Sequence, residues 1–400
     1  MASIINETAN HKVTTCWSGV MAMTLCAFAL VTSEFMPVSL LTPLARSLAV
    51  TEGMAGQGIT IAGIMAVITS LLITSIAGNL NRKTLLLGLT LIMAASGIVV
   101  ALATGFMTFM AGRALTGIAI GGFWSMSAAS AIRLVPPEKV PRALAIFNGG
   151  NALAAVVAAP IGSFLGSLIG WRWTFFSLAP VACCALFWMW ISLPSMPAVS
   201  GRKSIASMLS LMRYTRIASG IFAAAAFFMG QFALFTYVRP FLENVTGMTD
   251  SLLSLTLLAM GITGFAGTIL IGPFLHRSLY ITLVTIPLLM AATATGMAMF
   301  GSDILFVFFA LTLWGLVAAA APAGWWTWVA RTFPDDAETG GGLMVAIVNL
   351  AIAIGSVAGG LTFDHSGYRA TFLCSAVLLM FAALLAFIAG RQACDKPSYT

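Results

Sequence analysis

Two ionisable side chains lie inside long apolar runs of this sequence, where a charge is energetically costly. Glu34 falls about eight residues before the end of the first run, and Arg113 about eight residues after the start of the fourth. At about 1.5 Å per helical residue, both lie roughly 12 Å below the same membrane surface. This equal depth permits an ion pair. Ionisable groups at membrane depth mark ion or substrate pathways, and Glu34 is the sole acid in any predicted span.

We interpret Glu34 as a proton carrier and Arg113 as its charged neighbour. A carboxyl group in apolar surroundings takes up a proton more readily, and a nearby Arg opposes that uptake. The alternative is a structural ion pair that never changes its protonation. Because His11, His276 and His365 all fall in loops, no histidine relay is expected.

Other kinds of chemistry find little support in the sequence. No phosphate-binding GxxxxGK[ST] sequence is present, so direct ATP coupling is not expected. The six cysteines form no metal-spaced set. An intramembrane enzyme would need a catalytic set of side chains at membrane depth, which Glu34 alone does not supply. We therefore expect no enzyme, metal or cofactor, with the proton as coupling ion.

The elements that position these residues follow from composition. The 400 residues are 60% hydrophobic and 8% charged, whereas soluble proteins have about 25% charged residues. Since one spanning helix needs roughly 20 apolar residues, we predict an all-α membrane protein with twelve transmembrane helices. The predicted spans are 17–43, 55–77, 84–104, 106–132, 142–168, 172–193, 218–240, 251–274, 279–300, 304–330, 341–362 and 371–389.

A polar interruption at residues 194–217 divides the predicted spans into two groups of six. The sequence therefore predicts an N-terminal half (1–193), a cytoplasmic linker (194–217) and a C-terminal half (218–400). With the N-terminus inside, fourteen of the nineteen Lys and Arg residues face the cytoplasm, four face outward and Arg113 lies in a span. This bias predicts that both termini are cytoplasmic. The net charge of +7 is thus read as a topology signal, and no nucleic acid is expected.

An internal repeat supports the division into halves. Gly122-Phe-Trp-Ser125 matches Gly324-Trp-Trp-Thr327, and Gly170-Trp-Arg-Trp-Thr-Phe-Phe176 matches Gly367-Tyr-Arg-Ala-Thr-Phe-Leu373. The spacing stays near 200 residues. Parallel repeats of this kind are typical of secondary transporters.

Aromatic and amide side chains in the spans could form a substrate site. A planar substrate would stack on aromatic rings, and uncharged polar groups would orient it in a mostly apolar pocket. Each of them is also compatible with ordinary helix packing or an interfacial anchor. The predicted substrate-binding residues are Phe123, Trp124, Asn151, Gln231, Tyr237, Trp326 and Asn349.

Three short motifs in the spans and loops match patterns of a known transporter family. Arg113-Ala-Leu-Thr-Gly117 matches a fourth-helix RxxxG pattern, and Ala159-Pro160-Ile-Gly162-Ser163 resembles a fifth-helix GPxxGG antiporter motif. Gly78-Asn-Leu-Asn81-Arg82-Lys83 is a shortened GxLaDrxGrr loop, with Asn81 in place of the usual acid. With these motifs the chain resembles the major facilitator superfamily, in its twelve-span drug and metabolite proton-antiporter branch. The resemblance implies gating roles for Asn81, Arg82, Lys83, Pro160 and Gly162, although Asn81 cannot form the loop's usual salt bridge.

Longer runs resemble the bacterial purine ribonucleoside efflux group of that superfamily. They are Glu34-Phe-Met-Pro-Val-Ser-Leu-Leu-Thr-Pro43, Gly121-Gly-Phe-Trp-Ser-Met-Ser127, Arg133-Leu-Val-Pro-Pro137 and Gly230-Gln-Phe-Ala-Leu-Phe-Thr-Tyr-Val-Arg-Pro240. The resemblance implies proton-coupled export of nucleosides such as inosine or adenosine across the bacterial inner membrane. Efflux of sugars or hydrophobic drugs by the same mechanism stays open. We expect a monomer whose partners are the lipid bilayer, protons and the substrate.

Overall fold

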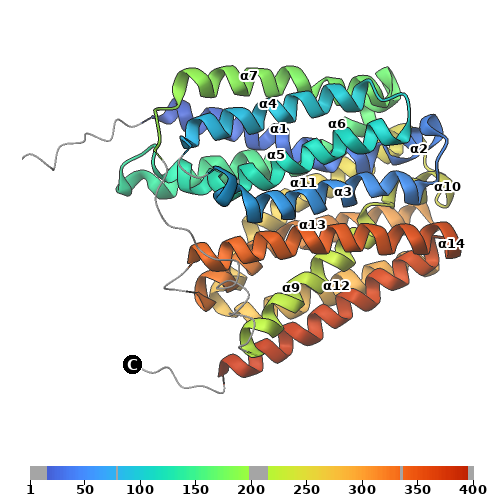
Figure 1. Cartoon of the computed structure of the whole chain (residues 1–400). Coiled ribbons are helices and arrows are strands. Elements are labelled where there is room, and N and C mark those ends of the chain that lie inside the picture. The colour runs from blue at the N-terminus through green and yellow to red at the C-terminus, as the bar shows by residue number, and fades with distance from the viewer. Residues whose placement is uncertain (1–15, 78–79, 198–214, 334–336, 395–400) are drawn as a thin grey trace, which may run out of the picture.

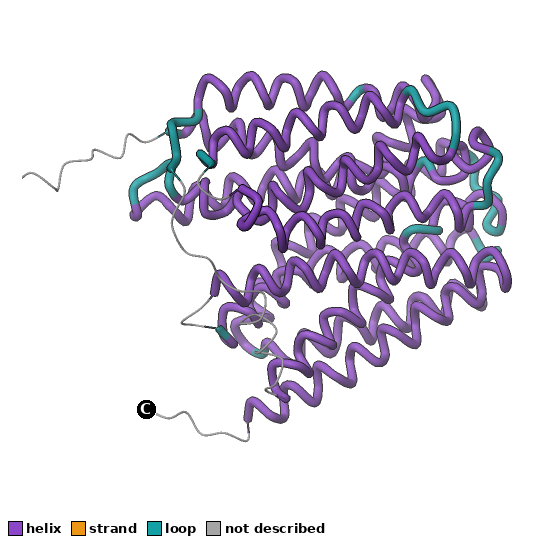
Figure 2. The backbone as a smooth tube through the Cα atoms, viewed as in Figure 1, coloured by secondary structure: helices purple, strands orange, loops and turns teal. Residues whose placement is uncertain are grey.

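A computed structural model describes residues 16–77, 80–197, 215–333 and 337–394. Within these ranges the regular elements are helices and no strand occurs (Figure 2). The α-helices are α1 (Trp17–Ser39), α2 (Leu41–Leu48), α3 (Glu52–Ala77), α4 (Arg82–Ala101), α5 (Phe106–Ile132), α6 (Val140–Phe176), α7 (Leu178–Ser192), α9 (Thr215–Phe235), α10 (Val238–Asn244), α11 (Asp250–Arg277), α12 (Leu279–Phe300), α13 (Ile304–Thr332) and α14 (Ala337–Cys394). Most of the predicted linker lies outside the described residues, so its boundaries stay a prediction.

The apolar helices account for the predicted membrane crossings. Ten described segments are long and apolar enough to span a bilayer. Two of them, Arg142–Ser192 and Leu343–Gln392, have 51 and 50 residues, more than twice the roughly 20 needed. Each is interrupted by a glycine with non-helical backbone, Gly170 or Gly367. The ten segments fall on the predicted runs, two of them covering two runs each. The all-α membrane fold is confirmed, and the count of twelve stays a prediction.

The repeat at Gly170 and Gly367 has the same local structure in both copies. The two glycines have φ values of 79° and 75°, in a region that is open essentially to glycine alone. Thr174 donates its hydroxyl to the carbonyl of Gly170, as Thr371 does to that of Gly367. The sequence repeat thus encodes the same sharp turn between two successive helices in each half, which we call the corner.

Apolar side chains divide between the inside of the bundle and its outer surface. One buried cluster draws on residues 20–196, and a larger one draws mainly on residues 221–386. Many large apolar side chains are nevertheless exposed, among them Leu102 at 71% and Met107 at 78%. An apolar exterior of this extent is stable only in contact with lipid, which agrees with a membrane-spanning bundle.

The N-terminal half (described residues 16–197) and the C-terminal half (215–394) meet closely at one end of the bundle, which we call the closed end. It carries the connections 102–105, 245–249 and 301–303. In Figure 1 it lies near the labels of α2 and α10, and α3 runs beside α14. Hydrogen bonds between the halves join Thr51 and Gly53 to Asp364, and Ser163 to Ser254.

Candidate functional site

Arg113 is held in the interior of the N-terminal half. Its side chain on α5 has no exposed surface. Its Nε donates to the carbonyl of Gly58 at 3.1 Å, and its Nη1 donates to the carbonyl of Ser33 at 2.9 Å. The other terminal nitrogen, Nη2, is buried without a hydrogen-bond partner among the described residues. Arg113 therefore ties α5 to α1 and α3 through backbone oxygens.

Glu34 follows Ser33 directly on α1 and is half-buried. Among the described residues, its carboxylate has no ion-pair or hydrogen-bond partner. The direct ion pair with Arg113 that equal depth permits is thus not formed in this conformation. The guanidinium bonds to the carbonyl of Ser33, the residue before Glu34, and to that of Gly58, rather than to the carboxylate. An acid placed in this way can gain or lose a proton without breaking a salt bridge.

Three aromatic rings bridge the halves beside Glu34. Phe35 on α1 contacts Phe232 and Phe235 of α9, with both pairs of ring centroids 6.1 Å apart. This contact brings the turn that carries Glu34 close to the turn that carries Gln231. Gln231 is half-buried, and its Oε1 is buried without a partner in the described part of the protein. The sequence predicted a role for Gln231 but not the contact between Phe35 and the two α9 rings, which we call the Phe35 bridge. Its only signal in the sequence is that a Phe directly follows both Glu34 and Gln231.

The predicted stacking aromatics lie in separate environments. Phe123 is fully buried and contacts Trp124 and Phe147, with ring centroids 6.2 and 6.3 Å apart. These rings belong to the core of the N-terminal half. Trp326 is 45% exposed on α13. No ring contact joins Trp326 to Trp124 in the described residues, so this conformation does not assemble them into one stacking site.

The other predicted polar residues divide into free and engaged groups. Asn151 is half-buried and has no hydrogen-bond partner among the described residues. Asn349 donates to the carbonyl of Val345 in its own helix. Tyr237 is fully buried, and its hydroxyl donates to the carbonyl of Ser356 at 2.9 Å. Tyr237 packs within the closed end here, whereas Gln231 and Asn151 have polar atoms left for a ligand.

Residues with predicted gating roles lie in two places. Asn81 caps α4, accepts from the backbone N–H of Lys83 and Met196, and donates to Ser195. Asn81 therefore fastens the segment after α7 within its own half. Arg82 reaches the Met126 sulfur on α5.

The second place lies on α6, at its contact with α1. Gly162 packs against α1, where an added Cβ would lie 2.3 Å from the Ser39 hydroxyl. Pro160 is buried two residues before it.

The charges inside the spans are more numerous than the sequence predicted. Arg239 on α10 is 4% exposed, and its Nε pairs with Glu243 at 2.6 Å. Both residues lie in the apolar segment Ile217–Asn244. This segment extends past the predicted span 218–240 and takes in Glu243, an acid besides Glu34. The i, i+4 spacing of Arg239 and Glu243, which lets each neutralise the other on one helix face, was the signal that charge counting missed.

Arg239 also crosses to the N-terminal half. Its Nη1 donates to the carbonyl of Ser39 and, at 3.3 Å, to the hydroxyl of Ser163. Its Nη2 lies 3.4 Å from Asp250. This network joins α10 and α11 to α1 and α6 at the closed end.

Residues 23–339 match the model of the Major Facilitator Superfamily. The chain belongs to the major facilitator superfamily. As its family and its transporter relatives indicate, it is a transporter rather than an enzyme.

Relatives and solved structures extend the match over nearly the whole chain. It is 58% identical over 379 residues to the transcription regulatory protein OpdE of Pseudomonas aeruginosa, with 94% of each chain covered. It is 38% identical over 369 residues to the purine ribonucleoside efflux pump NepI of Shigella sonnei, with 92% of this chain and 93% of NepI covered. A bacterial homologue of the human lysosomal transporter Spinster, solved in an inward-facing and unoccupied conformation, shares the fold. That similarity has a TM-score of 0.78 at 16% identity and covers 97% of this chain and 99% of the other.

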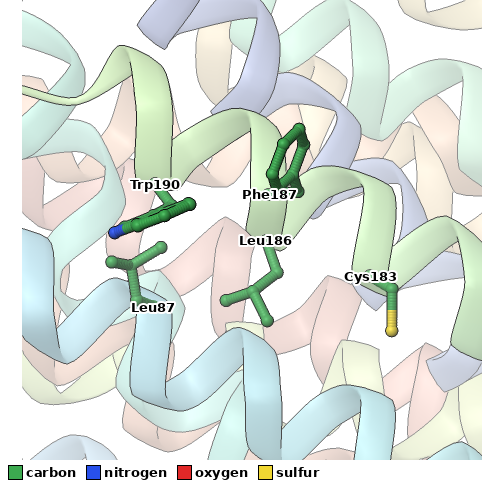
Figure 3. Close-up of a pocket in the computed structure, with 5 residues that line it drawn as sticks. All are labelled: Leu87, Cys183, Leu186, Phe187 and Trp190. Carbon is green, nitrogen blue, oxygen red and sulfur yellow. The ribbon is translucent and has the colours of Figure 1, made fainter.

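A separate groove opens on the apolar outer surface of the bundle. It lies between α4 and α7, holds about 300 Å³, and is lined by Leu87, Cys183, Leu186, Phe187 and Trp190 (Figure 3). Phe187 and Trp190 are each 60% exposed. The lining offers no charged group, so in a membrane-spanning transporter it is a lipid-facing surface.

Proposed function

We propose that the chain exports purine ribonucleosides from the cytoplasm in exchange for protons. The observation that carries the proton role is the half-buried Glu34 carboxylate, which has no ion-pair partner among the described residues and directly follows Ser33, whose carbonyl holds Arg113. The nucleoside assignment is supported by 38% identity to a purine ribonucleoside efflux pump over 92% of this chain. Both termini are proposed to be cytoplasmic, which makes this conformation closed toward the outside.

The cycle follows from this placement. With the cytoplasmic side open, a nucleoside would enter beside the Phe35 bridge, where Gln231 and Asn151 have polar atoms to offer and aromatic rings can stack on the base. Opening of the closed end would release the nucleoside outward and admit a proton to Glu34. Return to the present conformation would then deliver that proton to the cytoplasm.

Uptake of labelled inosine into everted membrane vesicles with an imposed proton gradient tests this function. We expect uptake by the parent protein that an uncoupler abolishes, and loss of gradient-driven uptake in Glu34→Gln. Glu138→Gln is the matched control, because Glu138 is an exposed acid in a short connecting helix. It should transport like the parent.

Two results would contradict separate parts of the proposal. Full gradient-driven uptake by Glu34→Gln would exclude Glu34 as the proton carrier. A well-folded parent that takes up no inosine would exclude the nucleoside and favour sugars or hydrophobic drugs.

A second candidate function is regulatory, and the 58% identity to a transcription regulatory protein favours it. A transporter can affect transcription by removing a small-molecule inducer from the cytoplasm. Under this reading, Glu34→Gln should abolish the transcriptional effect together with transport. A transcriptional effect that persists in a transport-inactive variant would instead indicate regulation without export.

A further inference from the structure

An acid from the C-terminal half caps a helix of the N-terminal half at the closed end. Asp364 lies on α14, and its Oδ1 accepts from the backbone N–H of Gly53 at 3.0 Å. Its Oδ2 accepts from the hydroxyl of Thr51 at 2.6 Å. Thr51 and Gly53 stand at the start of α3, where unpaired N–H groups and the helix dipole favour a negative charge.

The contact depends on an unusually close approach of α3 and α14. A Cβ added to Gly53 would lie 2.2 Å from Asp364 Oδ2 and 2.8 Å from the Gly360 carbonyl oxygen. A Cβ added to Gly360 would lie 3.1 Å from the Gly53 Cα and 2.5 Å from the Tyr237 hydroxyl. Only glycine allows the two backbones to come this near. The remaining crevice beside Asp364 is about 30 Å³, so the surfaces are in direct contact.

Asp364 differs from the Arg239 network in where its bonds go. Arg239 keeps the Glu243 and Asp250 pairs inside its own half when the halves part. The hydrogen bonds of Asp364 in the described residues both cross to α3. The Thr51 hydroxyl also accepts from the Met54 N–H at 3.1 Å, so α3 retains a cap of its own after separation.

We propose that Asp364 is a latch that stabilises the closed end selectively, by capping α3 only while the two halves are in contact. The inference rests on the proposed transport cycle in which this end opens. Charge-assisted hydrogen bonds are stronger than neutral ones. Removing the two Asp364 bonds therefore destabilises the closed state, and it leaves the open state, in which these bonds are absent, nearly unchanged. The latch therefore sets the ratio of closed to open molecules rather than the affinity for substrate.

Distance measurement between spin labels tests the latch without any substrate. Labels at Leu102 and Met299, 71% and 66% exposed, would report the separation of the halves at this end in a variant whose native cysteines are replaced. We expect Asp364→Ala to raise the ratio of long to short distances about tenfold, equivalent to about 1.4 kcal/mol. Asp303→Ala is the matched control, because Asp303 caps α13 within its own half. It should leave the distances unchanged.

A second variant keeps Asp364 in place. Gly53→Ala introduces a methyl group against the Gly360 backbone and should shift the distances in the same direction as Asp364→Ala. Two distance populations that neither variant redistributes would overturn the latch and leave the transport proposal intact. A parent protein with one unchanging distance, with or without a proton gradient, would overturn the alternating cycle itself.

Discussion

Replacement of Arg239 by Met should destabilise the protein by leaving a carboxylate buried without its partner. Glu243 is 17% exposed, and its Oε2 already has no hydrogen-bond partner in the described structure. Removal of one member of a buried pair costs about 3–5 kcal/mol. With an unfolding entropy of about 2.1 cal/mol/K per residue over 400 residues, the melting temperature should fall by about 4–6 °C.

The double variant Arg239→Met/Glu243→Met separates the charge effect from the loss of contacts. Replacement of a whole buried pair by apolar side chains of similar size is often nearly neutral. Asp250 also loses its partner in this variant, but its side chain is 63% exposed, so that ion pair contributes little. We therefore expect the double variant to melt within about 2 °C of the parent, since the remaining losses are the bonds to Ser39 and Ser163 and the exposed Asp250 pair.

Tryptophan fluorescence during heating provides the assay, because ten Trp residues are distributed along the chain. The parent and the two variants should be compared in one detergent. Equal melting temperatures for the single and double variants would refute the reasoning, since the unpaired Glu243 carboxylate would then not be the cause. An unchanged Arg239→Met would show that the pair makes no net contribution.

Glycine substitutions give three further predictions for the same assay. Gly117→Ala should destabilise the protein by about 1–3 kcal/mol, because its Cβ would lie 2.2 Å from the carbonyl oxygen of Ala62 on α3. Gly88→Ala on α4 meets no atom within 4 Å and should be neutral or stabilising by up to about 1 kcal/mol, so equal losses in the two variants would contradict the packing argument. Gly367→Ala should lower the free energy of unfolding by about 1–3 kcal/mol from backbone strain alone. Its φ is 75°, and a Cβ added there would meet no atom within 4 Å. No loss in that variant would show that the corner tolerates another conformation.

The sequence predicted features that depend on composition and local pattern. Membrane helices follow from long apolar runs, and the structure places helices where those runs lie. The repeated Gly170 and Gly367 corners could be found because each depends on a glycine, an arginine and a threonine at fixed local spacing. An aromatic residue beside the arginine is part of the same local pattern. The Arg172 guanidinium stacks on the Trp171 ring, with 4.2 Å between the guanidinium carbon and the ring centroid.

Features that depend on tertiary contacts were not predicted. Charge counting placed Arg239 on the outer side, because an Arg near the end of an apolar run resembles a topology signal. Its burial depends on the Ser39 carbonyl, 200 residues away in the chain. Asp364 likewise falls between two predicted spans, as an ordinary loop acid would, and only the fold shows that it contacts the start of α3. The sequence alone carries no signal for bonds whose two partners have ordinary local surroundings.

The position of Arg113 shows how a charge can influence Glu34 without bonding to it. Coulomb attraction falls only as the inverse of distance, so a guanidinium fixed by the Ser33 and Gly58 carbonyls attracts the Glu34 carboxylate while it is charged and stays in place when it is protonated. Because those bonds go to the backbone, proton transfer at Glu34 does not free Arg113 to move. In a direct ion pair, each protonation would have to break the contact and leave a buried guanidinium poorly paired, at considerable cost. The observed arrangement keeps the positive charge stationary while the proposed proton carrier changes its charge.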